Sequence, residues 1–327
     1  MNGFGRIFRI SIFGESHGEC IGVVMDGVPS GIKLSKEDFY SDLERRKSGK
    51  FGTTMRIEGD EPEIKSGVFN GFTTGAPILI LFENNGNESS TYEKIKDIPR
   101  PGHGDFTAMK KYNGYNDYRG GGHFSGRLTL GLVAAGVVAK KIFPDIRIKT
   151  SISGNNNEIF KNRIEMARES GDSVGAVVEC RVLGIDIGLG EPFFDSIESV
   201  LSHLIFSIPG IKGIEFGDGF KIAEKTGSEV NDLIIDKKGK TKTNYSGGIN
   251  GGITNGNDLV FRIAVKPTSS ISKPQQTFNF MTKKIERLEI EGNHDTCFAI
   301  RVPVIVEAVT AIVLSDFYLL HAKKKCK

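Results

Sequence analysis

The chain has 327 residues, 38% hydrophobic and 25% charged, with a formal net charge of +3. This length allows one or two domains with a well-buried core, and the weak positive charge excludes a strongly polybasic nucleic-acid binder as the default class. Glycine is abundant, at 41 residues, but has no three-residue period, which excludes collagen and places the excess in loops and at close backbone approaches.

The cysteines and the apolar segments predict a soluble, cytoplasmic protein. None of the four cysteines has the C-x-x-C spacing of a redox or zinc pair, and their low density argues against a disulfide scaffold. The first residues lack the apolar run of a signal peptide. The most apolar stretch, residues 302–314, contains Pro303 and Glu307 and is shorter than the roughly 20 residues of a membrane span. We expect no membrane and no nucleic-acid partner.

The apolar patterning predicts interleaved strands and helices in a single domain, residues 1–327. Residues 7–13 are typical of a first strand, and a helix is expected after Ser35, whose S-K-E-D sequence forms a capping-box pattern. Further helices are expected over residues 125–143, 159–169, 194–206 and 303–322, and strands over residues 173–182, 259–265 and 285–290. Short strands joined by Gly-rich turns favour a mixed or antiparallel α+β layer fold over a doubly wound one.

Residues 14–18, GESHG, match the G-x-S-x-G pattern of a serine-hydrolase nucleophile elbow. That elbow requires a helix directly after the serine, whereas the Gly and β-branched residues at 19–27 predict a strand, so the sequence disfavours a hydrolase. Two readings of His17 remain open. It is either incidental to a turn at a strand end or held among glycines so that a ligand can approach it closely.

A second histidine stands in a similar setting, in residues 100–105, RPGHGD. A lone histidine on a loop is usually exposed and inert. Two Gly-flanked histidines, His17 and His103, shift the balance toward an acid/base pair.

Two further clusters are suited to anions. Three glycines at 120–122 lead toward a predicted helix N-terminus, whose free N–H groups favour an anion, and Arg127 adds a full charge. The simpler reading is a flexible loop with Ser125 as an N-cap, and both can hold. Residues 266–270, KPTSS, follow a predicted strand and offer a cation, hydroxyls and turn N–H groups to a phosphate, although such turns also occur as ordinary strand ends.

The remaining clusters are less specific. The cationic helix end at 45–47 is, taken alone, best explained as a solvated terminus that complements the helix dipole. Residues 293–297, NHDTC, fit no common zinc spacing. Together the clusters predict a site for one or more phosphorylated small molecules, with histidines available for proton transfer.

These motifs, in this order, resemble those of the chorismate synthase family over nearly the whole chain. The matching segments are residues 14–18, 26–31, 42–46, 66–69, 100–103, 125–127, 134–136, 188–192, 213–217, 247–249, 266–270 and 303–307. Many separate motifs in register are far more specific than any single one.

The resemblance implies a lyase that converts 5-enolpyruvylshikimate-3-phosphate to chorismate and phosphate by anti-1,4-elimination, in the last common step toward aromatic amino acids. The family requires reduced FMN, although the reaction has no net redox change. Its fold is a sandwich of antiparallel sheets flanked by helices, assembled as a homotetramer. The sequence leaves open whether NADPH reduces the flavin at this protein or an external flavin reductase does so.

The resemblance also implies roles for individual residues. His17 would protonate the leaving phosphate, His103 would serve the reduced flavin, and Asp295 would take part in removing the C6 hydrogen through the flavin N5. Ser16 and Ser125 would hold polar contacts near these groups. The cations implied for the substrate's anionic groups or for NADP are Arg45, Arg46, Lys50 and Arg127. The implied flavin site comprises His123, Phe124, Ser125, Pro209, Gly210, Gly251, Lys266, Pro267, Thr268, Ser269, Ser270 and Asn293.

The chain departs from the family pattern at three places. Asn293 stands where the family usually has Arg, and His123-Phe124 stand where it has Arg-Ser. The loop after Lys47 lacks an expected Arg, for which Lys50 is the substitute. These departures bear on the affinity for FMN and substrate, whereas the implied catalytic residues are retained, so we expect activity to be kept. The alternative is a drifted paralogue that binds flavin without turnover.

Overall fold

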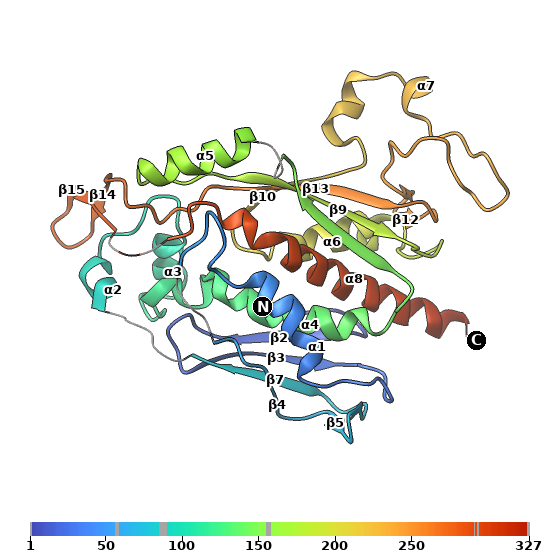
Figure 1. Ribbon diagram of the computed structural model, residues 1–327, viewed down its shortest axis with the longest axis horizontal. Coiled ribbons are helices and arrows are strands. Elements are labelled where there is room, and N and C mark those ends of the chain that lie inside the picture. The colour runs from blue at the N-terminus through green and yellow to red at the C-terminus, as the bar shows by residue number, and fades with distance from the viewer. Residues whose placement is uncertain are drawn as a thin grey trace.

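Two antiparallel sheets enclose a layer of helices in the computed structural model, which describes residues 2–55, 59–84, 90–154, 158–290, 292 and 294–325 (Figure 1). The five-stranded sheet has the order β1 (Gly3–Phe4), β2 (Arg9–Gly14), β3 (Cys20–Asp26), β7 (Ile78–Glu83) and β4 (Glu63–Ile64). The four-stranded sheet has the order β10 (Ile211–Phe216), β13 (Leu259–Val265), β9 (Ala176–Leu183) and β8 (Arg147–Ile152). Three two-stranded hairpins are β5 (Val68–Phe69) with β6 (Phe72–Thr73), β11 (Ile249–Asn250) with β12 (Ile253–Thr254), and β14 (Gln275–Asn279) with β15 (Lys284–Leu288).

The helical layer is built around α4 (Thr129–Lys140) and α8 (Val302–Lys325), with α1 (Glu37–Arg46) and α6 (Ile197–Ile205) beside them (Figure 1). The axes of α4 and α8 approach closely because Gly136 has no side chain, and a Cβ placed there would lie 2.3 Å from the Cβ of Ala308. The shorter helices are α2 (Ser90–Ile95), α3 (Asp105–Lys111), α5 (Glu158–Glu169) and α7 (Gly227–Val230). The 3₁₀ turns are η1 (Arg119–Phe124), η2 (Gly126–Leu128), η3 (Phe193–Asp195), η4 (Gly219–Glu224) and η5 (Phe298–Ile300).

Strand alternation explains how each sheet covers the helices. In β13 the side chains of Leu259, Phe261 and Ile263 are buried, while the intervening residues are less so, as expected for a sheet with one face on the core. By contrast, α4 is buried all round, in agreement with its apolar sequence, because it is packed between β3 on one side and α8 on the other.

The α+β class and the antiparallel sheets expected from the sequence are confirmed. The arrangement is more specific than expected, since α4 and α8 lie between the sheets rather than on their outer faces. The helix predicted from residue 125 begins at Thr129, because residues 126–128 form the 3₁₀ turn η2. The helix predicted from residue 194 begins at Ile197, after the side chain of Ser196 caps it by accepting from the Ser199 N–H.

By length and composition α8 would be able to cross a membrane, since residues 302–322 have a mean hydropathy of 1.8 in their most apolar window. However, 83% of that window is buried inside the structure, which is typical of a core helix in a soluble protein. From the sequence we expected no membrane span here, on the ground that the apolar stretch covers only residues 302–314. The apolar part of the helix is longer and extends over residues 302–322.

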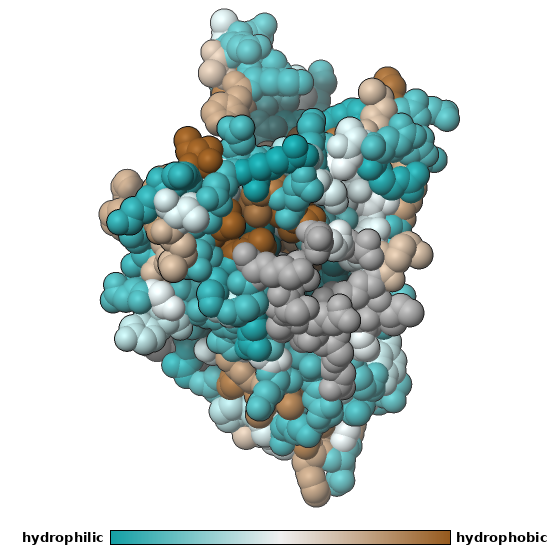
Figure 2. Space-filling model, turned by 90° about the vertical axis from the view of Figure 1, so that its left-hand side faces the viewer, coloured by the Kyte–Doolittle hydropathy of each residue, from teal (hydrophilic) through white to brown (hydrophobic). Residues whose placement is uncertain are grey.

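One end of the layered structure gathers the loops that carry the sequence motifs. There β2 ends at Gly14, α3 begins at Asp105, β13 ends at Val265 and α8 is preceded by η5 (Figure 1). Figure 2 looks onto this end, where hydrophobic residues lie in a hollow between hydrophilic surfaces. The fold therefore brings together segments that are far apart in the sequence.

Candidate active site

The hollow is a pocket of about 600 Å³, within the usual range for small-molecule sites. Five of the clusters found in the sequence contribute to its wall, although they span residues 14 to 297. The sequence-predicted residues that line it are Ser16, His17, His103, Phe124, Ser125, Arg127, Pro209, Gly210, Lys266, Pro267, Thr268, Ser269, Ser270 and Asp295.

Three of the predicted cations make other contacts and are not part of the described pocket wall. Arg45 forms a bidentate ion pair with Glu307, at 2.6 and 2.7 Å. Lys50 donates to the backbone carbonyl of Arg45. The side chain of Arg46 is 1% exposed and bonds to a buried carboxylate. The three side chains are thus held by partners within the protein, and none of them is among the described residues that line the pocket.

Two positions in the predicted flavin set lie elsewhere, and a third is outside the described residues. The Nδ1 of His123 lies 2.8 Å from the carbonyl oxygen of Gly14, which anchors the imidazole to the end of β2. Gly251 is in the β11–β12 hairpin and is not among the described lining residues. Asn293 lies outside the described residues.

His17 is held against a glycine loop. The Ser16 N–H donates to the carbonyl of Gly122, which fixes the turn after β2 on the loop that precedes α4. Gly120 has a φ of +59°, and a Cβ built there would lie 2.7 Å from Nε2 of His17 and 2.8 Å from Oγ of Ser16. Only glycine allows this approach. The imidazole is 9% exposed and packs edge-on against Tyr92, with ring centroids 5.2 Å apart.

The segment after Ser16 confirms that the turn is not a nucleophile elbow. Residues 16–19 form a turn and bend, and β3 begins at Cys20, antiparallel to β2. The sequence therefore continues as a strand, as expected, and no helix lifts Ser16 above a sheet.

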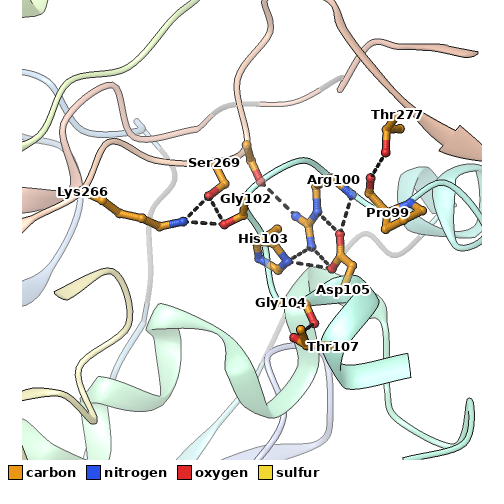
Figure 3. A network of polar contacts seen from close by, with 11 residues as sticks. Pro99, Arg100, Gly102, His103, Gly104, Asp105, Thr107, Lys266, Ser269 and Thr277 are labelled. Carbon is orange, nitrogen blue, oxygen red and sulfur yellow. Dashed lines mark hydrogen bonds and ion pairs between the residues drawn. The ribbon is translucent and has the colours of Figure 1, made fainter. Parts of the chain in front are cut away.

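His103 lies at the centre of a polar network (Figure 3). Its Nδ1 is 2.7 Å from Oδ1 of Asp105, and Asp105 also accepts from the backbone N–H, Nε and Nη2 of Arg100. Arg100 in turn donates through Nη1 to Oγ of Ser270, at 3.0 Å. Burial alone would raise the pKa of Asp105, but the hydrogen bonds and charges of Arg100 and His103 outweigh it and hold that pKa well below the usual range. Asp105 is therefore an anion.

The 266–270 turn contacts the His103 loop from the other side of the pocket. Lys266 Nζ donates to the carbonyl of Gly102 and to Oγ of Ser269, and Ser269 Oγ donates to the same carbonyl (Figure 3). Burial lowers the pKa of Lys266, and the nearby charge of Lys212 lowers it further. The ammonium group is thus partly desolvated at the pocket wall, where an anion would interact with it strongly.

Two further side chains of the pocket wall, those of Arg127 and Asp295, are fixed by ion pairs. Arg127 donates to Asn84 Oδ1 and to Oδ1 of Asp60, whose other oxygen accepts from Arg46. On the opposite side, Asp295 accepts from the backbone N–H of Thr54 at 2.8 Å and lies 3.4 Å from Nη1 of Arg301.

The structure adds lining residues that sequence reasoning did not single out, among them Tyr92, Arg100, His294 and Arg301. Arg100 carried a local signal, since it and Asp105 flank His103 in the same motif. Asp60 and Arg301 belong to no motif found in the sequence. Asp60 pairs with Arg46 and Arg127, 14 and 67 residues away, and Arg301 donates to Asp295 and to the carbonyl of Arg46, 6 and 255 residues away.

Comparisons with known proteins find relatives of this chain along nearly its whole length. A family model described as chorismate synthase matches residues 8–319. The chain is 59% identical to a chorismate synthase of Chitinophaga pinensis, over 99% of this chain and 98% of that one. It is 48% identical to a chorismate synthase of Pyrococcus abyssi, over 96% and 97% of the two chains. A crystal structure of a chorismate synthase superimposes with a TM-score of 0.74 at 27% identity, covering 97% of this chain and 93% of the other.

Proposed function

Because the chain belongs to the chorismate synthase family, we propose that the pocket lined by His17 and His103 is its active site. The chain is a lyase of the shikimate pathway that converts 5-enolpyruvylshikimate-3-phosphate to chorismate and phosphate, and it requires reduced flavin. The observation that carries the assignment to this pocket is the convergence of two histidines, a partly buried aspartate and several cations on one cavity, from motifs that lie far apart in the chain.

The lining suits FMN in two respects. Thr268 Oγ1 and His294 Nε2 are buried polar atoms with no hydrogen-bond partner among the described residues, so a polar ligand would satisfy them. Apolar side chains stand near these polar groups, including Phe124 and Phe298, and they suit the face of an aromatic ring. We propose that residues 266–270 bind the cofactor's anionic part, with Phe124 and Pro209 beside the ring.

The substrate carries a phosphate and two carboxylates, and the remaining cations of the wall suit these groups. Arg127 and Arg301 each use part of their donor fork on an aspartate, Asp60 and Asp295 respectively. A guanidinium carries a full positive charge and presents its N–H donors in a planar fork that matches phosphate and carboxylate, and both arginines line the pocket. The aspartates fix the direction of these donors before the substrate arrives, which reduces the entropy lost on binding.

Each catalytic group has a defined task in this proposal. His17, fixed between Gly120 and Tyr92, protonates the phosphate as it leaves. Asp295, held by Thr54 and Arg301, takes part in the removal of the C6 hydrogen. His103 presents its imidazole to the flavin. Reduced FMN, when bound, supplies electron density that assists the departure of phosphate.

The finer points of the cofactor and the assembly are also proposals. We propose a cytoplasmic homotetramer, supported by large apolar side chains that a single chain leaves in solvent, such as Phe194 at 92% and Phe220 at 84% exposure. We propose NADPH as the source of reducing equivalents, used either at this chain or by an external flavin reductase. Anaerobic addition of NADPH and FMN to the purified chain separates the two routes, since loss of oxidised-flavin absorbance without a reductase assigns the reduction to this chain.

An anaerobic assay tests the proposed function. Purified protein is mixed with 5-enolpyruvylshikimate-3-phosphate and chemically reduced FMN, and phosphate and chorismate are followed together. Matched production of both supports the proposal and shows that His123, Phe124 and Asn293 are tolerated. Flavin binding with no product would favour a paralogue that binds the cofactor without turnover.

A further inference from the structure

Among the described residues, the imidazole of His103 has hydrogen-bond partners at one of its two ring nitrogens, Nδ1. Its Nδ1 lies 2.7 Å from Oδ1 of Asp105 and 3.1 Å from Nη2 of Arg100. Figure 3 shows the other ring nitrogen on the side of the ring away from Asp105. Since His103 lines the pocket, the nitrogen left for a ligand is Nε2.

The partners of Nδ1 decide where the proton sits in the neutral ring. With the proton on Nδ1, both Nδ1–H and the Arg100 Nη2–H donate to the same oxygen of Asp105, which accepts from Nη2 at 2.8 Å. With the proton on Nε2, the lone pair of Nδ1 would face the carboxylate at 2.7 Å, which is repulsive. The first arrangement makes the shortest contact of the ring, that of Nδ1 with Oδ1 of Asp105, a charge-assisted hydrogen bond. We propose that Asp105 is a positioning residue, which with Arg100 fixes the proton of His103 on Nδ1 and presents Nε2 to the pocket.

Asp105 is itself placed with little freedom. It is the first residue of α3, where a negative charge is favoured by the helix dipole, and three donors of Arg100 fix both of its oxygens. Arg100 is 5% exposed, donates to Ser270, and its guanidinium carbon lies 5.7 Å from the ring centroid of Tyr92. Charge-assisted hydrogen bonds in such a desolvated setting are among the stronger ones in proteins.

The effect of the tautomer on the reaction rate rests on the proposed role of His103. The assignment of the tautomer itself does not depend on that role. An imidazole that is fixed at Nδ1 can only exchange its proton with a ligand through Nε2, in both the neutral and the charged form. In the opposite tautomer the neutral ring carries its proton on Nε2. It would then present an N–H to the ligand instead of a lone pair. The wrong tautomer can cost a large part of the rate even where the geometry is intact.

The variant Asp105→Asn should change His103 from the Nδ1–H tautomer to the Nε2–H tautomer. Both oxygen positions of Asp105 face donors from Arg100, so the new amide must direct its NH₂ toward at least one of them. Turning the NH₂ toward His103 is the tolerable choice, because only His103 can change its role from donor to acceptor by moving its proton to Nε2. Asp117→Asn is the matched control. Asp117 accepts from the backbone N–H, Nε and Nη2 of Arg119 in the same way, but no hydrogen bond joins it to His103 among the described contacts.

The experiment is ¹⁵N NMR of histidine-labelled protein without cofactor, at a pH where the imidazoles are neutral, combined with kcat and KM of the same variants. We expect His103 to be the Nδ1–H tautomer in the unaltered protein and in Asp117→Asn, and the Nε2–H tautomer in Asp105→Asn. We also expect kcat of Asp105→Asn to fall by about 10²–10⁴-fold, with KM little changed.

The possible failures are distinguishable. An Nε2–H tautomer in the unaltered protein overturns the proposal without any variant, and so does an unchanged tautomer in a folded Asp105→Asn. A changed tautomer with an unchanged kcat overturns the positioning role together with the proposed role of His103. The proposed function of the chain would survive the first two results, since its products are measured independently.

Discussion

Gly120 lies directly against the imidazole of His17. A Cβ on Gly120 would fall 2.5 Å from Cδ2 of that ring, closer than two such atoms can stand. The triple-glycine segment is therefore needed for contact with His17 as well as for its own left-handed backbone, in which Gly120 and Gly121 have φ of +59° and +83°. The sequence had suggested an anion loop here; the structure shows a surface that shapes the position of a histidine.

We predict that Gly120→Ala reduces turnover sharply, because the new methyl group must displace His17 or Ser16. The control is Gly71→Ala, which also has positive φ, at +78°, but has open space around the new Cβ. Both variants should lose about 1–2 kcal/mol of stability from left-handed strain. Thermal unfolding and kcat measure the two effects. Equal activity losses in both variants would show that backbone strain alone, and not contact with His17, explains the effect.

Asp60 holds the guanidinium group of Arg127 in place at the pocket wall. Its side chain is completely buried and bridges Arg46, at 2.5 Å, and Arg127, at 2.9 Å. We predict that Asp60→Ala destabilises the protein by about 3–5 kcal/mol, because it leaves two guanidinium groups without their buried counter-charge.

The control for Asp60 is Asp172→Ala, since the exposed pair of Asp172 with Lys273 should contribute at most about 1 kcal/mol. Chemical denaturation measures both variants. Similar small losses would contradict the view that Asp60 organises the arginines.

The pH dependence of stability follows from the same carboxylate. Burial would raise the pKa of Asp60, but the charges and hydrogen bonds of Arg46 and Arg127 outweigh it and lower that pKa below its ordinary value. The pKa of an aspartate in an unfolded chain is about 3.9. Asp60 therefore contributes stability that is present above that pH and is lost as the pH falls through its lower folded pKa.

Asp105 has a lowered pKa and contributes with the same sign. We expect the melting temperature to fall steeply below about pH 4, and Asp60→Asn to reduce that slope. Scanning calorimetry across this range provides the measurement. An unchanged slope in the variant would mean that Asp60 carries none of the dependence.

Lys266 should contribute to cofactor affinity through its charge. We predict that Lys266→Met weakens FMN binding by about 10- to 100-fold, the usual effect of losing a charged hydrogen bond. Lys273→Met is the control, because Lys273 lies in the same loop region but forms an exposed pair with Asp172. Flavin titration followed by fluorescence measures both. Unaltered affinity in Lys266→Met would remove residues 266–270 from the proposed anion site.

Local patterns predicted the motifs well but not their mutual contacts. The glycine-flanked histidines and the KPTSS turn were visible in the sequence because each needs a special backbone, and the α+β class followed from short strands and Gly-rich turns. The layering of α4 between the sheets was not visible, since an all-apolar helix is compatible with burial on any side.

The two arginines at the end of α1 show most clearly which contacts a local sequence pattern cannot predict. Arg45 and Arg46 matched a family motif, yet their guanidinium groups bond to Glu307 and Asp60. These partners are 262 and 14 residues away, and no local pattern connects them.

If the pocket that contains His17 performs the reaction, the turnover number of His17→Ala in the anaerobic assay must fall. We predict a kcat about 10²–10⁴-fold lower with FMN binding retained, because a general acid is lost while the flavin contacts remain. His203→Ala, whose ring packs on Phe4 outside this pocket, should keep normal turnover. A near-normal kcat in His17→Ala would contradict the assignment of this pocket.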